Sequence, residues 1–140
     1  MSEHNILGAI LAGGQSKRMG QDKLFLELNN KKLIEYTIDK VKKYLGQVII
    51  ITNQSNEFFN KNNLITVKDC IDGQLGPLVG ILTAMKWAKD QSNKYSWVAT
   101  FPCDTPFFPE SIIKNFIKEA EKKESLILSA SSHGRKHNIF

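Results

Sequence analysis

The chain has 140 residues, 41% of them apolar and 24% charged, which is enough for one globular domain with a hydrophobic core and excludes a disordered protein. No apolar run approaches the roughly 20 residues that cross a bilayer, and the N-terminus has no signal-peptide pattern, so we expect no membrane segment and a cytoplasmic location. The net charge of +5 comes from lysines spread over predicted helix faces without interleaved aromatic residues, which argues against nucleic acid and favours a small anionic substrate.

The first predicted element is a buried strand over residues 6–11, and a glycine-rich loop follows it, from Leu11 to Lys23. Three glycines, a serine hydroxyl and the cations of Arg18 and Lys23 coincide in this loop. Glycines let backbone N–H groups approach a ligand closely, so the loop predicts a polyphosphate site. Its glycine spacing fits neither the Walker loop nor the dinucleotide fingerprint, and the alternative interpretation is a glycine-rich surface turn.

The rest of the chain alternates helix and strand patterns. A short extended piece ends at the Asn29-Asn30 turn, Gly46 is predicted to end the first helix, and Leu78, Ile81, Leu82 and Met85 predict a later one. The predicted helices and strands cover, in order, residues 34–45, 48–52, 55–60, 64–67, 77–85, 97–101, 109–121 and 126–129. This alternation predicts an α/β fold with three layers, α/β/α, around a mostly parallel, Rossmann-like sheet.

Polar residues follow the predicted strands where ligands gather in open α/β sheets, beyond the carboxyl ends. Asn53, Asp69 and Asp104 stand there with the glycine-rich loop. The Asp104 carboxylate suits Mg²⁺, although the residue also fits a helix cap or a turn between two prolines, and spacing alone leaves both open. Asn53 could contact a base or a ribose, and Asp69 is a second candidate acid; both also fit ordinary turn positions.

The segment from Leu11 to Lys23 reads L-A-G-G-x-S-x-R-M-G-x-D-K, and Cys103–Pro106 reads C-D-T-P. In these motifs the chain resembles the molybdenum cofactor guanylyltransferases, which have the nucleotide-diphospho-sugar transferase fold. The resemblance covers essentially the whole chain. It implies transfer of GMP from GTP to the phosphate of molybdenum-bound molybdopterin, with release of pyrophosphate, in molybdenum cofactor biosynthesis.

The resemblance also implies roles for individual residues. Lys23 and Arg18 would hold the triphosphate, and Asp104 would hold Mg²⁺. Proteins of cofactor assembly, or the molybdoenzymes themselves, would be the partner proteins. The implied GTP site consists of Leu11, Ala12, Gly13, Gly14, Lys23, Asn53, Asp69 and Asp104.

Two other functions fit the sequence. One is a related nucleotidyltransferase that uses CTP or UTP, but the Gly13-Gly14 pair and the C-D-T-P motif favour the guanylyl branch. The other is a catalytically silent GTP-binding assembly subunit. Family members continue past the position of Phe140, so we expect residues 1–140 to form a single nucleotidyltransferase domain that is C-terminally truncated on the acceptor side.

The remaining sulfur and imidazole groups predict no metal site of their own. Cys70 and Cys103 are far apart in the sequence and outside any C-x-x-C motif, which predicts two thiols without a disulfide. His133 and His137 have a spacing that suits zinc on a helix, but Gly134 between them favours a hairpin tip.

Overall fold

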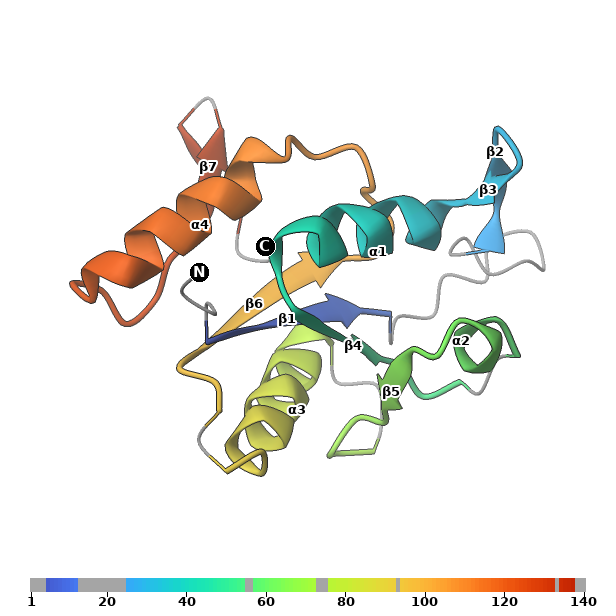
Figure 1. The fold of residues 1–140 in the computed structure, drawn as a ribbon, viewed down its shortest axis with the longest axis horizontal. Helices are drawn as coiled ribbons and strands as arrows, with labels where there is room; N and C mark the ends of the chain where they lie inside the picture. Colours follow the sequence, from blue (N-terminus) through green and yellow to red (C-terminus); the bar gives the residue numbers. More distant parts are fainter. Residues whose placement is uncertain are drawn as a thin grey trace.

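The fold is centred on a parallel sheet covered by helices on both faces (Figure 1). The computed structural model describes residues 5–12, 25–54, 57–72, 76–92, 94–132 and 134–137. Four strands form the sheet in the order β5-β4-β1-β6, and all neighbouring pairs are parallel. In chain order these strands are β1 (Ile6–Leu11), β4 (Gln47–Ile51), β5 (Ile65–Val67) and β6 (Trp97–Pro102).

Helices form the two outer layers. On one face of the sheet lie α1 (Leu33–Tyr44) and α4 (Ser111–Lys122), and on the other lies α3 (Pro77–Lys89), while the short α2 (Glu57–Lys61) precedes β5 (Figure 1). Strand β1 is buried on both sides because its side chains alternate between the two layers. Ile6 and Ile10 pack with α1 and α4, and Leu7 and Ala9 pack with α3. The predicted three-layer α/β/α fold is confirmed.

Two glycines allow helices to lie close to β1. A Cβ atom on Gly8 would be 2.9 Å from Cγ1 of Val41 in α1, and one on Gly80 of α3 would be 3.1 Å from Cδ2 of Leu11. A side chain on Gly8 would therefore force Val41 to shift, and one on Gly80 would press on the end of the Leu11 side chain. Close packing at Gly80 therefore brings the first turns of α3 to the end of β1, where the glycine-rich loop begins.

Two small antiparallel hairpins complete the structure. In the first, β2 (Glu27–Leu28) pairs with β3 (Lys31–Lys32) across Asn29 and Asn30, which both have positive φ, so the predicted turn is confirmed. In the second, β7 (Ala130–Ser132) pairs with β8 (Arg135–His137), and Gly134 has a φ of 76°. The hairpin predicted from Gly134 is present, whereas His133 lies outside the described residues.

Three local predictions are wrong. Helix α1 ends at Tyr44, and Leu45 takes an extended conformation, so Gly46 does not end the helix. The final helix begins at Ser111 rather than Pro109. Residues 126–129 form no strand: Leu126 and Ile127 are 96% and 85% exposed, and strand pairing begins at residue 130. Apolar character alone predicted that strand, but no pairing partner lies beside it within the described chain.

Helix α3 begins at Pro77 as predicted, but its apolar stripe is not its buried face. Leu78 is 76% exposed and Met85 55% exposed. The buried residues of this helix are mostly small: Val79, Gly80, Thr83, Ala84 and Ala88. Small residues face the sheet because the helix packs so close to β1. None of the helices in the described part of the chain has the length and apolar character of a membrane span.

Candidate functional site

The carboxyl ends of the four sheet strands form one row. The hydrogen-bonding register pairs Val67 with Ile51, Ile51 with Leu11, and Leu11 with Pro102, and these four residues are the last of their strands. Because Val67, Ile51, Leu11 and Pro102 each end a strand, the residues that follow them leave the sheet at the same level.

Three predicted site residues stand at equivalent places beyond this row. Asn53, Asp69 and Asp104 each lie two residues past the last residue of β4, β5 and β6. The equivalent position after β1 is Gly13, which lies outside the described residues together with Gly14, Arg18 and Lys23. Leu11 and Ala12 are described, and the Ala12 N–H donates to the Ile51 carbonyl at 2.8 Å. The end of β1 is therefore fixed to β4 just before the glycine-rich loop.

Asn53 and Asp69 bind each other through two hydrogen bonds. The Asn53 side-chain amide donates to Asp69 Oδ2 at 2.9 Å, and the Asp69 backbone N–H donates to Asn53 Oδ1 at 3.0 Å. The Thr52 N–H donates to the Val67 carbonyl at 3.0 Å, which continues the ladder up to this pair. The pair fixes which way the Asn53 amide points, so its second N–H and the carboxylate have defined directions.

One oxygen of Asp69 has no hydrogen-bond partner among the described residues. Asp69 Oδ1 is inaccessible to solvent and makes no hydrogen bond within the described part of the chain. A carboxylate oxygen buried without a donor is costly, so a hydrogen-bond donor brought to this atom would stabilise the arrangement.

A threonine that the sequence reasoning missed connects this pair to α3. Thr83 is buried; its hydroxyl donates to the Val79 carbonyl at 2.7 Å and accepts the Cys70 N–H at 2.9 Å. The residue after Asp69 is thereby tied to the helix beneath it. A signal was available in the sequence, since a threonine among the small residues of an otherwise apolar helix is a candidate for such a contact.

Asp104 lies on the other side of β1 from Asn53 and Asp69, because β6 and β4 are the two neighbours of β1. Two strand spacings separate β4 from β6, roughly 10 Å. The Asp104 side chain is exposed in the loop between β6 and α4. The structure therefore brings Asn53 and Asp69 together and sets Asp104 apart from them, with the end of β1 between.

The loop after Asp104 is held by Lys40, which projects from α1. The Lys40 ammonium donates to the backbone carbonyls of Pro106 at 2.6 Å and Phe108 at 2.7 Å, and it lies 4.3 Å from the centre of the Phe108 ring. Burial lowers the pKa of Lys40, and the nearby carboxylate of Glu110 partly opposes this effect. The sequence reasoning counted Lys40 only among the lysines spread over predicted helix faces and missed this contact.

A second contact joins α1 to the residue before α4. The Tyr44 hydroxyl donates to Glu110 Oε2 at 2.5 Å, and the Lys43 ammonium lies 3.2 Å from the same oxygen. The hydrogen bond from Tyr44 and the Lys43 cation hold the pKa of Glu110 below its ordinary value of 4.5. Helix α1 therefore contacts the connection between Asp104 and α4 at Pro106, Phe108 and Glu110.

The Asp104 carboxylate is better suited to a metal ion that takes most of its ligands from water and a bound substrate than to one held by protein side chains alone. No group of three or more His, Cys, Asp or Glu side chains is positioned to hold a metal among the described residues. A single exposed carboxylate supplies one hard oxygen ligand, and Mg²⁺ commonly takes its other ligands from water and substrate phosphates. These residues fit a magnesium ion that binds together with a nucleotide.

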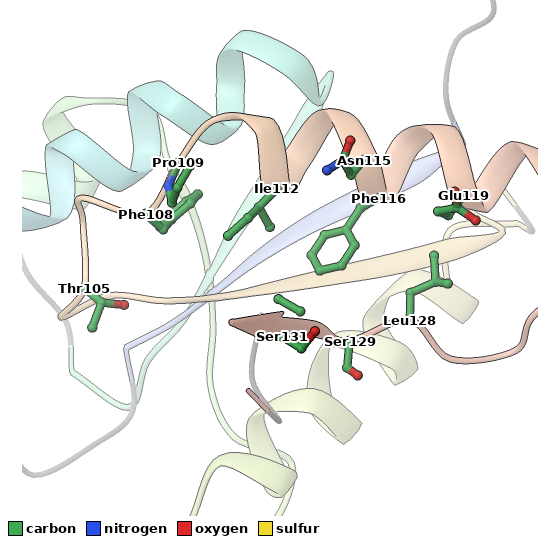
Figure 2. Close-up of a pocket in the computed structure, with 11 residues that line it drawn as sticks. Thr105, Phe108, Pro109, Ile112, Asn115, Phe116, Glu119, Leu128, Ser129 and Ser131 are labelled. Carbon is green, nitrogen blue, oxygen red and sulfur yellow. The ribbon is translucent and has the colours of Figure 1, made fainter. Parts of the chain in front are cut away.

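A groove of about 620 Å³ lies between α4 and residues 128–131 (Figure 2). Its walls are mainly apolar, and Ile112, Phe116 and Leu128 contribute to them. Thr105, Phe108 and Pro109 of the connection after Asp104 line one part of it, and the other lining residues belong to α4 and to residues 128–131. The groove therefore borders the connection that carries Asp104, and the Asp104 side chain itself is not among the lining residues.

Comparison with known proteins decides the family. Residues 8–140 match the model of the MobA-like NTP transferase domain. The chain belongs to this family. A molybdenum cofactor guanylyltransferase from Yersinia pestis is 34% identical over 137 residues, which cover 97% of this chain and 67% of that relative.

Solved structures support the MobA-like fold. Molybdopterin-guanine dinucleotide biosynthesis protein A from Archaeoglobus fulgidus matches with a TM-score of 0.67 and 22% identity, over 95% of this chain and 64% of that one. The 4-diphosphocytidyl-2C-methyl-D-erythritol synthase from Anaerococcus prevotii matches with a TM-score of 0.60 and 18% identity, over 98% and 63%. The predicted nucleotide-diphospho-sugar transferase type is confirmed, and the chain spans about two thirds of the length of these relatives.

Proposed function

We propose that this chain binds GTP and transfers its GMP group to the phosphate of molybdenum-bound molybdopterin, releasing pyrophosphate. The observation that carries the proposal is the row of strand ends: the nucleotidyltransferase signature follows β1, the Asn53–Asp69 pair lies on one side, and Asp104 lies on the other. The name of the Yersinia pestis relative supports guanylyl transfer as the reaction.

We assign the nucleoside to the side with Asn53 and Asp69. Their mutual hydrogen bonds hold the Asn53 amide and the Asp69 carboxylate in fixed directions, as recognition of ribose hydroxyls or a base edge requires. The loop after β1 would receive the triphosphate, with Lys23 and Arg18 as its cations. The roughly 10 Å between β4 and β6 is a distance that a triphosphate can span to reach Asp104.

The reaction requires alignment and charge neutralisation more than proton transfer. An oxygen of the acceptor phosphate attacks the α-phosphorus of GTP, the bond to the β-phosphate breaks, and pyrophosphate leaves with the electron pair. The acceptor is a phosphate monoester whose second pKa is about 6, so it is mostly dianionic at neutral pH and needs no strong base. Asp104 would hold Mg²⁺, which would neutralise charge on the triphosphate and on the departing pyrophosphate.

The proposed setting follows from this assignment. The cytoplasm is the proposed compartment, and proteins of cofactor assembly or molybdoenzymes are the proposed partners.

A nucleotide panel tests the proposal. Thermal-shift measurements with GTP, CTP, UTP and ATP, each with magnesium, should give the largest stabilisation with GTP. A larger shift with CTP or UTP would instead indicate a related transferase. Pyrophosphate release in the presence of the molybdopterin acceptor then tests catalysis; tight GTP binding without release would indicate a binding subunit and overturn the proposed transfer.

A further inference from the structure

The contact between Lys40 and the loop after Asp104 differs from the ion pairs of the other lysines in the described part of the chain. Lys31, Lys43 and Lys122 pair with carboxylates on the surface. Lys40 instead donates to two main-chain carbonyls, 66 and 68 residues away in sequence, and covers the face of Phe108. Hydrogen bonds with a charged donor are among the stronger ones in proteins, so this contact is suited to hold a backbone in place.

The loop that Lys40 contacts has two fixed ends. At one end, Pro102 is in register with Leu11 of β1. At the other, Pro106 and Phe108 are buried and their carbonyls accept the Lys40 hydrogen bonds. Asp104 lies midway between Pro102 and Pro106 and is exposed. The backbone of Asp104 is therefore held on both sides while its carboxylate stays available.

We infer that Lys40 is a positioning residue for Asp104: by binding the carbonyls of Pro106 and Phe108, it fixes the loop from which the Asp104 carboxylate takes up magnesium with the nucleotide. This inference rests on the proposed function, because it assumes that Asp104 is the metal ligand. Lys40 itself does not contact the metal or GTP. Because Lys40 already orders the loop, less conformational freedom is lost when the metal binds.

The test uses two variants of α1. Lys40→Met keeps a chain of similar length over the Phe108 ring but removes the ammonium donor, and Lys42→Met is the matched control because Lys42 is an exposed lysine of the same helix. The measurement is the magnesium concentration that gives half-maximal GTP binding. We expect Lys40→Met to raise it about tenfold, as loss of a supporting contact typically does, and Lys42→Met to leave it unchanged.

A double-mutant comparison separates positioning from a general structural role. In an Asp104→Asn background, Lys40→Met should weaken GTP binding in saturating magnesium less than twofold, because the carboxylate that Lys40 positions is already gone. Lys40→Arg, which keeps the cation and its donors, should recover most of the magnesium affinity. An equal loss with and without the Asp104 carboxylate would overturn the inference, as would a Lys40→Met variant that matches Lys42→Met.

Hydrogen–deuterium exchange of the unaltered chain gives a test that does not depend on variants folding. Without metal or nucleotide, the amides of residues 104, 105, 107 and 108 should exchange more slowly than those of the exposed segment 124–127; residue 106 is a proline and has no amide hydrogen. Equal rates would contradict a loop that is fixed before metal binds.

Two outcomes separate the proposed function from the inference. If the unaltered chain shows no magnesium-dependent GTP binding, the proposed function fails. If magnesium dependence is lost with Asp104→Asn but unaffected by Lys40→Met, only the inference fails.

Discussion

Asn53 and Asp69 close a ring of two hydrogen bonds between the segments that follow β4 and β5. The amide of Asn53 donates to the Asp69 carboxylate, and the Asp69 backbone N–H donates to the Asn53 carbonyl oxygen. Each residue thus sets the direction of the other before any ligand arrives. Side chains that are already ordered before binding strengthen the binding, because less rotamer freedom is lost when the ligand is bound.

The first prediction concerns this pair. Asn53→Ala removes both hydrogen bonds, frees the Asp69 carboxylate to rotate and should weaken GTP binding roughly tenfold or more, since a hydrogen bond to a charged group contributes about 1.5–3 kcal/mol. Asn62→Ala is the control, because the hydrogen bond that this amide makes within the described residues goes to the Phe58 carbonyl of α2, away from Asp69. Titration with a fluorescent GTP analogue measures the affinity of both variants. Equal affinity of Asn53→Ala and Asn62→Ala would remove Asn53 from the site.

The second prediction concerns Thr83. Thr83→Val keeps the shape of this buried side chain but leaves the Cys70 N–H without its acceptor, so the free energy of unfolding should fall by about 1–2 kcal/mol. Thr83→Ser keeps the hydroxyl, so its free energy of unfolding should fall by less. Urea denaturation followed by circular dichroism gives both values. A Thr83→Val variant as stable as the unaltered chain would mean that the hydrogen bond to Cys70 adds nothing to folding.

A third prediction uses two glycines beside α1. Gly8→Ala places a Cβ atom 2.9 Å from Val41 and 3.2 Å from Leu45, and overpacking of this kind typically costs about 1–3 kcal/mol. Gly46→Ala is the control, because no atom lies within 4 Å of its added Cβ. Thermal unfolding should show a clearly lower melting temperature for Gly8→Ala only. If both variants have the same melting temperature, α1 does not pack against β1 as closely as described.

The fourth prediction concerns acid stability through Glu110. Tyr44 and Lys43 lower the pKa of this carboxyl below 4.5, so its stabilising contribution is present above pH 4.5 and is lost as the pH falls through the lowered value. Glu110→Gln should therefore melt below the unaltered chain at neutral pH, and the difference should shrink in more acidic buffer. Melting curves at several pH values check this, with the exposed Glu124→Gln as control. A difference that does not change with pH would contradict the assigned cause.

Sequence reasoning predicted the fold where local pattern and tertiary context agree. Alternating strand and helix patterns predicted the sheet, and the rule that ligands gather at strand ends singled out Asn53, Asp69 and Asp104 before their common row was known. The contacts of Lys40 and Thr83 could not be predicted, because each joins residues distant in sequence or in different elements. The predictions of a buried Leu78 and of a strand at Leu126 were wrong, because an apolar residue is buried only where another element covers it.

The two thiols of the chain stand at opposite flanks of the row of strand ends: Cys70 follows Asp69, and Cys103 precedes Asp104. They are the only cysteines in the sequence, and one is exposed whereas the other is half-buried. Their unequal accessibility allows stepwise labelling with two different dyes or spin labels, without engineering new attachment points. The unaltered protein can therefore carry one probe on each side of the row of strand ends, which allows the distance between the two flanks to be compared with and without added nucleotide.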